Sequence, residues 1–322
     1  PGLFRNIFPT PAAENENRVI CLSGVGHDIF YTQMANCIVE LKYSNSSNGS
    51  TQAFPLYVYD TDGTNRRDNI SDWALKEYQT HYNDPTITKS DIFYHIYALL
   101  HHPVYRERYA QNLKRELPRV PFVGESAPLP QTTDTSPPPN PLPKDWRGGT
   151  ETGESPFPHS MGEGLGMGDK STPPNSMTEG LGMGDKSPFH TLAKLGRDLS
   201  YWHLNYEQEA EYPLEHLQNP KVPPSLRVEV MRLNKDKTEL VVNESLTLRG
   251  IPSRVFEYKL GNRSALEWVI DQYRVTTDKR SGIINDPNRA DDAGYIVRLV
   301  KQVVHVSLET LRIVDEIAKL TF

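Results

Sequence analysis

The chain is poor in cysteine and has no long apolar run. Its two cysteines, Cys21 and Cys37, belong to no Cys-x-x-Cys pair or Cys/His cluster, so we expect reduced thiols rather than a disulfide framework. No apolar stretch approaches the roughly 20 residues that span a bilayer, and the start of the chain lacks the features of a signal peptide. These absences predict a cytoplasmic protein with no membrane partner. Because the sequence does not begin with Met, we expect an excised region of a longer polypeptide.

The chain also lacks the basic excess that is typical of nucleic-acid-binding proteins, since it carries 35 Lys and Arg against 41 Asp and Glu. The distribution matters more than the sum. Residues 124–188 hold nine acidic and four basic residues, which leaves the remainder close to neutral. A near-neutral domain can still bind DNA through a local basic groove. The charge therefore neither supports nor excludes a nucleic-acid partner.

Residues 124–188 differ sharply in composition from the rest. Their first part is rich in proline, and a stretch that begins at Ser160 is repeated sixteen residues later from Ser176. Such a composition buries too little apolar surface to offset the entropy lost on ordering. We therefore expect a disordered Pro/Gly-rich insertion at 124–188 that interrupts a single domain, formed by residues 1–123 and 189–322.

Motifs for catalysis are missing. Each repeat contains GLGMGDKS, but Asp169 and Asp185 stand directly before Lys, where a phosphate-binding loop needs Gly. An adenine methyltransferase would need an NPPY-like tetrapeptide, and NDPN at Asn285 lacks the paired prolines and the aromatic residue. A metal site could be drawn only from the histidines His95, His101 and His102. Because no carboxylate lies at ligand spacing, we favour packing roles for them. An independent enzyme is the weakest of the alternatives.

Hydrophobic patterning predicts an α+β fold, with helical hairpins packed against short, mainly antiparallel sheets. Short β-branched or aromatic runs predict early strands at 18–24, 35–43 and 53–59. Alternating runs predict a later antiparallel sheet at 226–233, 237–243 and 245–251. Helices are expected at 72–82, 189–207, 264–273 and 295–320, with a break near His305 in the last. The polar stretch 276–294 predicts a loop.

Residues 91–122 predict a helical hairpin with a basic second helix. Thr88 and Asp91 form a capping-box pattern, and Pro103 suits the first turn of the second helix. In that helix a buried stripe is expected from Tyr105, Tyr109 and Leu113. Five basic residues stand there against Glu107 and Glu116, namely Arg106, Arg108, Lys114, Arg115 and Arg119. This local excess in an acidic chain indicates a surface for an anionic partner.

Nine residues are candidates for DNA contacts. Arg pairs bidentately with guanine and Asn or Gln with adenine, while Arg elsewhere neutralises phosphate. The basic helix offers Arg108, Gln111, Asn112 and Arg115 on exposed positions. The other candidates, in polar segments, are Arg66 and Arg67 before the helix capped by Ser71, and Arg280, Asn285 and Asn288. The alternative is that each of them is an ordinary surface residue.

Several blocks in a fixed order carry a resemblance to a known family. They are SGVGHDIF at 23–30, FPLYVY at 54–59, RRDNIS at 66–71, the hairpin, WHLNYE at 202–207, and SALEWVIDQY followed by SGIINDPN. In this order they resemble the C-terminal specificity domain of type ISP restriction-modification enzymes, over about residues 18–122 and 189–322.

The resemblance implies a non-catalytic module that recognises a duplex DNA sequence. It implies that the module positions the adenine-specific methyltransferase and helicase-nuclease domains of its parent polypeptide. It also implies that S-adenosylmethionine, ATP and Mg are bound by the parent enzyme, with no cofactor in this chain. The alternative is a scaffold that packs on the methyltransferase and translocase without reading bases.

Overall fold

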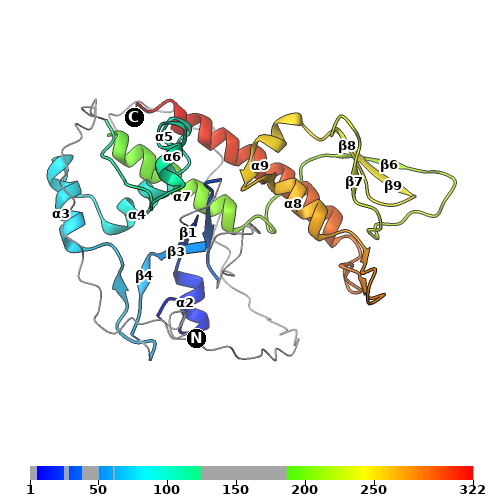
Figure 1. Ribbon diagram of the computed structural model, residues 1–322, viewed down its shortest axis with the longest axis horizontal. Coiled ribbons are helices and arrows are strands. Elements are labelled where there is room, and N and C mark those ends of the chain that lie inside the picture. Colours follow the sequence, from blue (N-terminus) through cyan, green and yellow to red (C-terminus); the bar gives the residue numbers. More distant parts are fainter. Residues whose placement is uncertain (1–5, 25–28, 38–50, 61, 125–186, 322) are drawn as a thin grey trace. The chain divides into compact units, whose positions relative to one another are not determined.

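The fold is α+β, as predicted (Figure 1). Every strand pair among the described residues is antiparallel. The computed structural model describes residues 6–24, 29–37, 51–60, 62–124 and 187–321. The parts before and after the middle segment belong to one compact unit. Most of the strand expected at 35–43, and the insertion expected at 124–188, lie outside the described residues. No helix in the described part is long and apolar enough to cross a membrane.

A three-stranded sheet of order β2-β1-β3 forms near the N-terminus, after the short helix α2 (Pro11–Glu16). Its strands are β1 (Val19–Ser23), β2 (Thr32–Ala35) and β3 (Thr51–Pro55). All five residues of β1 are buried because it is the central strand. A two-stranded ribbon follows, formed by β4 (Tyr57–Val58) and β5 (Arg67–Asp68).

Five helices follow, and the first three begin where the sequence predicts. They are α3 (Asp72–His81), α4 (Lys89–Leu99), α5 (Pro103–Arg108), α6 (Ala110–Leu113) and α7 (Pro188–Leu204). Ser71 caps α3, and Thr88 and Asp91 form the full capping box of α4. Pro103 occupies the first turn of α5. The predicted starts of α3, α4 and α5 are therefore confirmed.

Helices α4 and α7 pack closely at Gly196. A Cβ atom built on Gly196 would lie 1.9 Å from the carbonyl oxygen of Tyr94, so no larger residue fits without moving a helix. Around this crossing Leu192 and Leu199 are fully buried in the same cluster as Tyr97. Residues separated by the whole middle segment thus share one core.

The C-terminal sheet has the order β6-β9-β8-β7. Its strands are β6 (Glu215–Gln218), β7 (Arg232–Leu233), β8 (Glu239–Val241) and β9 (Leu246–Arg249). After it come the 3-10 helix η1 (Ser253–Glu257), the ribbon β10 (Lys259–Leu260) and β11 (Arg263–Ser264), and helix α8 (Ala265–Gln272). The capping box of Ser264 and Glu267 starts α8, as predicted.

The strand expected at 226–233 is short, since only Arg232 and Leu233 pair as β7. Before β7 the regular pairing is lost, because the N–H groups of Glu229 and Val230 both donate to the carbonyl oxygen of Val242, at 3.1 and 3.0 Å. Side-chain amides bind the backbone of Val228 and Arg227. The Asn288 side chain accepts a hydrogen bond from the N–H of Val228 and donates one to the carbonyl oxygen of the same residue. The Asn243 amide donates to the carbonyl oxygen of Arg227 at 2.6 Å. The prediction was wrong here because these partners come from distant parts of the sequence.

The last helix, α9 (Tyr295–Ala318), is continuous, so the break expected near His305 is absent. The His305 side chain is held by contacts outside the helix. Its Nδ1 lies 2.7 Å from the carbonyl oxygen of Ala210, and its ring packs on Trp202. The loop expected at 276–294 also contains regular structure. It holds a small hairpin of β12 (Thr276–Thr277) and β13 (Ile284–Asn285).

The described residues that flank the middle segment lie next to each other. A Cβ atom on Gly124 would be 3.5 Å from Cγ of Pro188. Nearby, the hydroxyl of Tyr82 accepts a hydrogen bond from the N–H of Val123 at 2.8 Å, and its ring lies 4.9 Å from that of Phe189. The chain therefore leaves this unit and re-enters it at the same place.

Candidate nucleic-acid interface

The predicted basic helix is a kinked pair, α5 and α6, rather than one straight helix. Tyr109 leaves helical geometry, with φ −104° and ψ 17°, yet its N–H still bonds to Tyr105 and its carbonyl to the N–H of Leu113. Tyr105 and Leu113 are buried and Tyr109 is half-buried, as the stripe predicted. The kinked pair thus presents one fixed outer face.

Three of the four candidates of this segment lie on the kinked pair, namely Arg108, Gln111 and Asn112, and Arg115 lies in the turn that follows α6. All four are exposed. The Asn112 amide donates to Glu116 at 3.0 Å, and Glu116 also pairs with Arg119 at 3.0 Å. The Asn112 hydrogen bond, followed by Arg119, holds the pKa of Glu116 below its usual value, so it stays anionic. Asn112 must exchange this partner before it can pair with a base.

Arg106 does not lie on this outer face, although it is one of the five basic residues counted in the segment. Its Nε donates to the carbonyl oxygen of Leu100 at 2.6 Å, and its guanidinium lies 5.7 Å from the centre of the Phe30 ring. Burial lowers the pKa of Arg106 to about 10, which keeps it charged at neutral pH. The sequence did not predict this contact. Arg106 follows the buried Tyr105, and its side chain extends back to Leu100 at the end of α4.

Arg66 lies in the loop directly before strand β5, as predicted, whereas Arg67 is the first residue of that strand. Both are about half exposed and already hold carboxylates, Arg66 with Glu16 and Arg67 with Asp60, each at 2.7 Å. The guanidinium of Arg66 also lies 4.6 Å from the centre of the Tyr57 ring. Exposed ion pairs of this kind stabilise a protein by only about 0–1 kcal/mol. Replacing each carboxylate partner by a phosphate therefore loses little free energy.

Two further candidates, Arg280 and Asn285, are exposed on the β12–β13 hairpin. Asn288 differs from them. Its side-chain oxygen accepts from the N–H of Val228 and its amide donates to the carbonyl of the same residue, both at 2.8 Å. Val228 is fully buried. Asn288 therefore ties the base of the hairpin to the core of the C-terminal sheet.

The candidates lie in three groups: Arg66 and Arg67 at the β4–β5 ribbon, four residues on the kinked pair and in the turn after it, and the others on or next to the β12–β13 hairpin. Sequence reasoning missed two neighbours in the third group. Ile283 and Ile284 are exposed by 68% and 64%, and two adjacent isoleucines in an otherwise polar segment were the signal.

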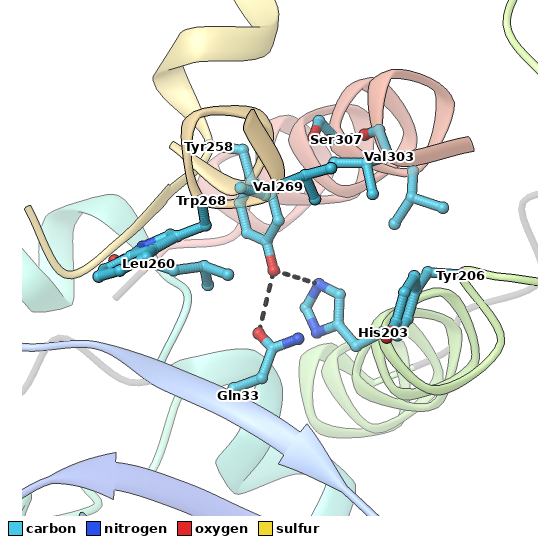
Figure 2. A pocket seen from close by; sticks show the side chains of 11 residues that line it. Gln33, His203, Tyr206, Tyr258, Leu260, Trp268, Val269, Val303 and Ser307 are labelled. Carbon is cyan, nitrogen blue, oxygen red and sulfur yellow. Dashed lines mark hydrogen bonds between the residues drawn. The ribbon is translucent and has the colours of Figure 1, made fainter. Parts of the chain in front are cut away.

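A second feature is a cavity of about 190 Å³ between α7, α8 and α9 (Figure 2). It is lined mainly by apolar and aromatic side chains, among them Trp268, Val269 and Val303. Tyr258 reaches across it and donates to Gln33 at 3.0 Å, with His203 Nε2 at 3.1 Å on its other side. No carboxylate lines this cavity.

The polar groups of the cavity continue into a buried network around His203. Its Nδ1 lies 2.5 Å from the hydroxyl of Tyr97, and its Nε2 lies 3.2 Å from that of Thr310. Burial, followed by the charge of Arg106, lowers the pKa of His203 to about 3. The imidazole is therefore neutral and is a poor general base near pH 7. The network fits a structural role, linking α4, α7 and α9.

The three histidines considered as metal ligands are all buried. His95 stacks on Phe189, His101 Nδ1 lies 2.9 Å from the carbonyl oxygen of Tyr97, and His102 caps α5. Within the described part of the chain, no three His, Cys, Asp or Glu side chains come together as metal ligands.

Comparison with protein families gives one match over most of the chain. The family described as the type ISP C-terminal specificity domain matches residues 2–131 and 183–301. No curated protein matches the chain.

Solved structures with the same fold include three large assemblies with DNA. A structure titled as the DrdV–DNA complex is 30% identical with a TM-score of 0.68, and the match covers 97% of this chain and 25% of that one. A nuclease-deletion mutant of the type ISP enzyme LlaGI with a DNA substrate mimic is 28% identical, with a TM-score of 0.63 and coverages of 97% and 22%. The type ISP enzyme LlaBIII bound to DNA is 23% identical, with a TM-score of 0.67 and coverages of 99% and 17%, and shares the fold. The chain spans a quarter or less of these proteins.

Proposed function

The chain belongs to the type ISP C-terminal specificity domain family, and on that premise we propose that it selects a sequence in duplex DNA. The observation that carries this proposal is the family match on both sides of the middle segment, at 2–131 and 183–301. It is supported by the DrdV and LlaGI structures, both of which contain DNA or a DNA mimic. Two proteins of known structure with this domain thus hold DNA in the state that was solved.

The chemistry of the exposed groups suggests which residues contact bases and which contact phosphates. On the kinked pair and the turn after it, Arg108 and Arg115 supply fork-shaped donors for guanine or phosphate, and Gln111 and Asn112 supply amides for adenine. Arg66 and Arg67 exchange their carboxylates for phosphates and set the register of the duplex. On the β12–β13 hairpin, Arg280 and Asn285 are exposed for contact, whereas Asn288 holds the hairpin in place.

The rest of the parent polypeptide supplies the chemistry. In this proposal an adenine-specific methyltransferase and a helicase-nuclease use S-adenosylmethionine, ATP and Mg, and this chain binds none of them and is not itself catalytic. Residues 124–188 form an insertion within one domain made of 1–123 and 189–322. The adjacency of Gly124 and Pro188 supports that arrangement, since an insertion must leave and return at one point.

The direct test is a binding titration of the full chain against a randomised duplex pool at two salt concentrations, with sequencing of the retained DNA. We expect an enriched asymmetric motif. Salt-sensitive binding without a motif would mean that selectivity needs the attached methyltransferase. An absence of binding would favour the alternative, a scaffold that packs on the methyltransferase and translocase.

A further inference from the structure

We propose that the β12–β13 hairpin enters a groove of the duplex tip first, with Lys279 and Arg280 on phosphates and Ile283 and Ile284 against the bases and sugars. This inference rests on the proposed function and assigns it an apolar contact element. A two-stranded ribbon has the right width for the major groove, and apolar side chains next to cations are also the means by which proteins wedge into the minor groove.

The tip of the hairpin is a preformed turn. Asp278 Oδ1 accepts hydrogen bonds from the N–H groups of Arg280 and Ser281, at 3.0 and 2.6 Å, and from the Ser281 hydroxyl at 2.8 Å. Gly282 closes the turn with φ +72°, a conformation that favours glycine. These bonds, those of Ser281 first, lower the pKa of Asp278, so its carboxylate is ionised and engaged within the turn. A preformed tip loses little entropy on binding.

The charge of the tip suits an anionic partner. Lys279 and Arg280 are exposed, and within the described part of the chain neither forms an ion pair. Arg274, the nearest basic residue before them in sequence, does form an ion pair, with Asp271 at 2.9 Å. The two cations of the tip are therefore available for phosphates, and they lie on the turn that leads the hairpin.

The apolar pair is placed directly behind the cations. Ile283 and Ile284 are, with Trp73, the most exposed large hydrophobic side chains of the described residues. Ile284 is the first residue of β13, and Ile283 directly precedes it, with its carbonyl oxygen accepting a hydrogen bond from the N–H of Asp278 at 2.9 Å. Two adjacent isoleucines exposed to this degree gain favourable free energy when a partner covers them.

The base of the hairpin is fixed to the folded core. Asn288 binds the buried Val228 through two hydrogen bonds, and Arg227 pairs with Asp286. The strands pair at Thr276 with Asn285 and at Thr277 with Ile284. A rigid arm with a basic tip and an apolar pair fits insertion into DNA better than a flexible surface loop would.

The test is a set of double variants of the full chain, titrated with the enriched duplex over a salt series. Ile283→Ser with Ile284→Ser should weaken binding about tenfold or more while leaving the salt dependence unchanged, because apolar contact and not charge is lost. Lys279→Ala with Arg280→Ala should lower the slope of log affinity against log salt by about 2. Ile283→Val with Ile284→Val, which keeps the apolar surface, should restore most of the affinity.

The outcomes separate this inference from the proposed function. If the unaltered chain binds DNA selectively and the serine variant binds equally well, the hairpin lies outside the groove and the inference is overturned. If the unaltered chain binds no DNA, the proposed function fails first. Both isoleucines are exposed, so circular dichroism and thermal unfolding of the variants should match those of the unaltered chain.

Discussion

The hydroxyl of Tyr97 on α4 lies 2.5 Å from Nδ1 of His203 on α7, in a fully buried contact. The two residues stand on opposite sides of the middle segment in sequence, yet they share one hydrogen bond inside one core. This contact, together with the close crossing at Gly196, makes each flank depend on the other for its fold.

Tyr97→Phe should therefore destabilise the whole unit. The change removes only a hydroxyl from a fully buried ring, but it leaves a buried nitrogen of His203 without this partner. The expected loss is about 1–3 kcal/mol in the free energy of unfolding, measured by urea denaturation. Tyr206→Phe, at an exposed position, is the control and should change stability by no more than about 0.5 kcal/mol. Equal effects of both variants would contradict a special role for the buried pair.

Stability should fall as the pH is lowered from about 6.5 to 5. Burial lowers the pKa of His95 to about 4 and that of His203 to about 3, and moves that of His101 well below its usual value. The unfolded chain takes up protons on these side chains near pH 6.5, whereas the folded chain does not, so acid favours unfolding. Each histidine should contribute a slope of up to about 1.4 kcal/mol per pH unit.

Denaturant titrations at several pH values test this expectation, with His95→Phe as the matched variant. Phenylalanine keeps a ring to stack on Phe189, whose centre lies 4.6 Å from that of His95. It removes one of the groups that must be protonated on unfolding. The slope should decrease by up to about 1.4 kcal/mol per pH unit, and an unchanged slope would show that His95 does not contribute.

Gly196→Ala should be strongly destabilising, against the usual rule for helices. In an ordinary helix the change to alanine is favourable by about 1 kcal/mol. At Gly196 the new Cβ would lie 1.9 Å from the Tyr94 carbonyl oxygen, so α4 and α7 must separate. Overpacking of this kind costs about 3 kcal/mol or more. Lys76→Ala, on an exposed site of α3, is the control in thermal unfolding, and equal midpoints for the two variants would contradict the tight crossing.

Local signals in the sequence predicted helix starts well. The capping boxes at Thr88 and Ser264 were found because both partners lie within three residues of each other. Pro103 and Ser71 predicted the starts of α5 and α3 for the same reason, since each acts within its own first turn. The α+β class followed from hydrophobic periodicity, which each element carries by itself.

Features that depend on distant partners could not be predicted. The irregular backbone before β7 depends on the carbonyl of Val242 and on the amides of Asn243 and Asn288. The placement of Arg106 depends on its contacts with Leu100 and Phe30. Strand β6 (Glu215–Gln218) was also missed, because it alternates weakly and is defined by its pairing with β9. At the candidate interface, the sequence named exposed residues but could not show that Asn288 serves the core.

Excision of residues 127–185, with a short Gly/Ser linker in their place, should leave the unit folded. Gly124 and Pro188 are already in contact distance, so the linker spans no gap. Shortening the loop should stabilise the unit by up to about 2 kcal/mol, because less closure entropy is lost on folding. Thermal unfolding and the DNA titration provide the measurement, with a scrambled segment of equal length as the control. Loss of the folded unit would contradict the arrangement as an insertion.

Helix α9 belongs to two hydrophobic cores at once. Residues from Tyr295 to Val304 pack with the C-terminal sheet, whereas Ile313 and Ile317 pack with the N-terminal sheet, α4 and α7. Since the helix is unbroken between them, neither core can melt without exposing apolar side chains of a helix that the other still holds. The two cores are thereby thermodynamically coupled, and the described unit should unfold in a single cooperative transition although its three-stranded and four-stranded sheets are separate.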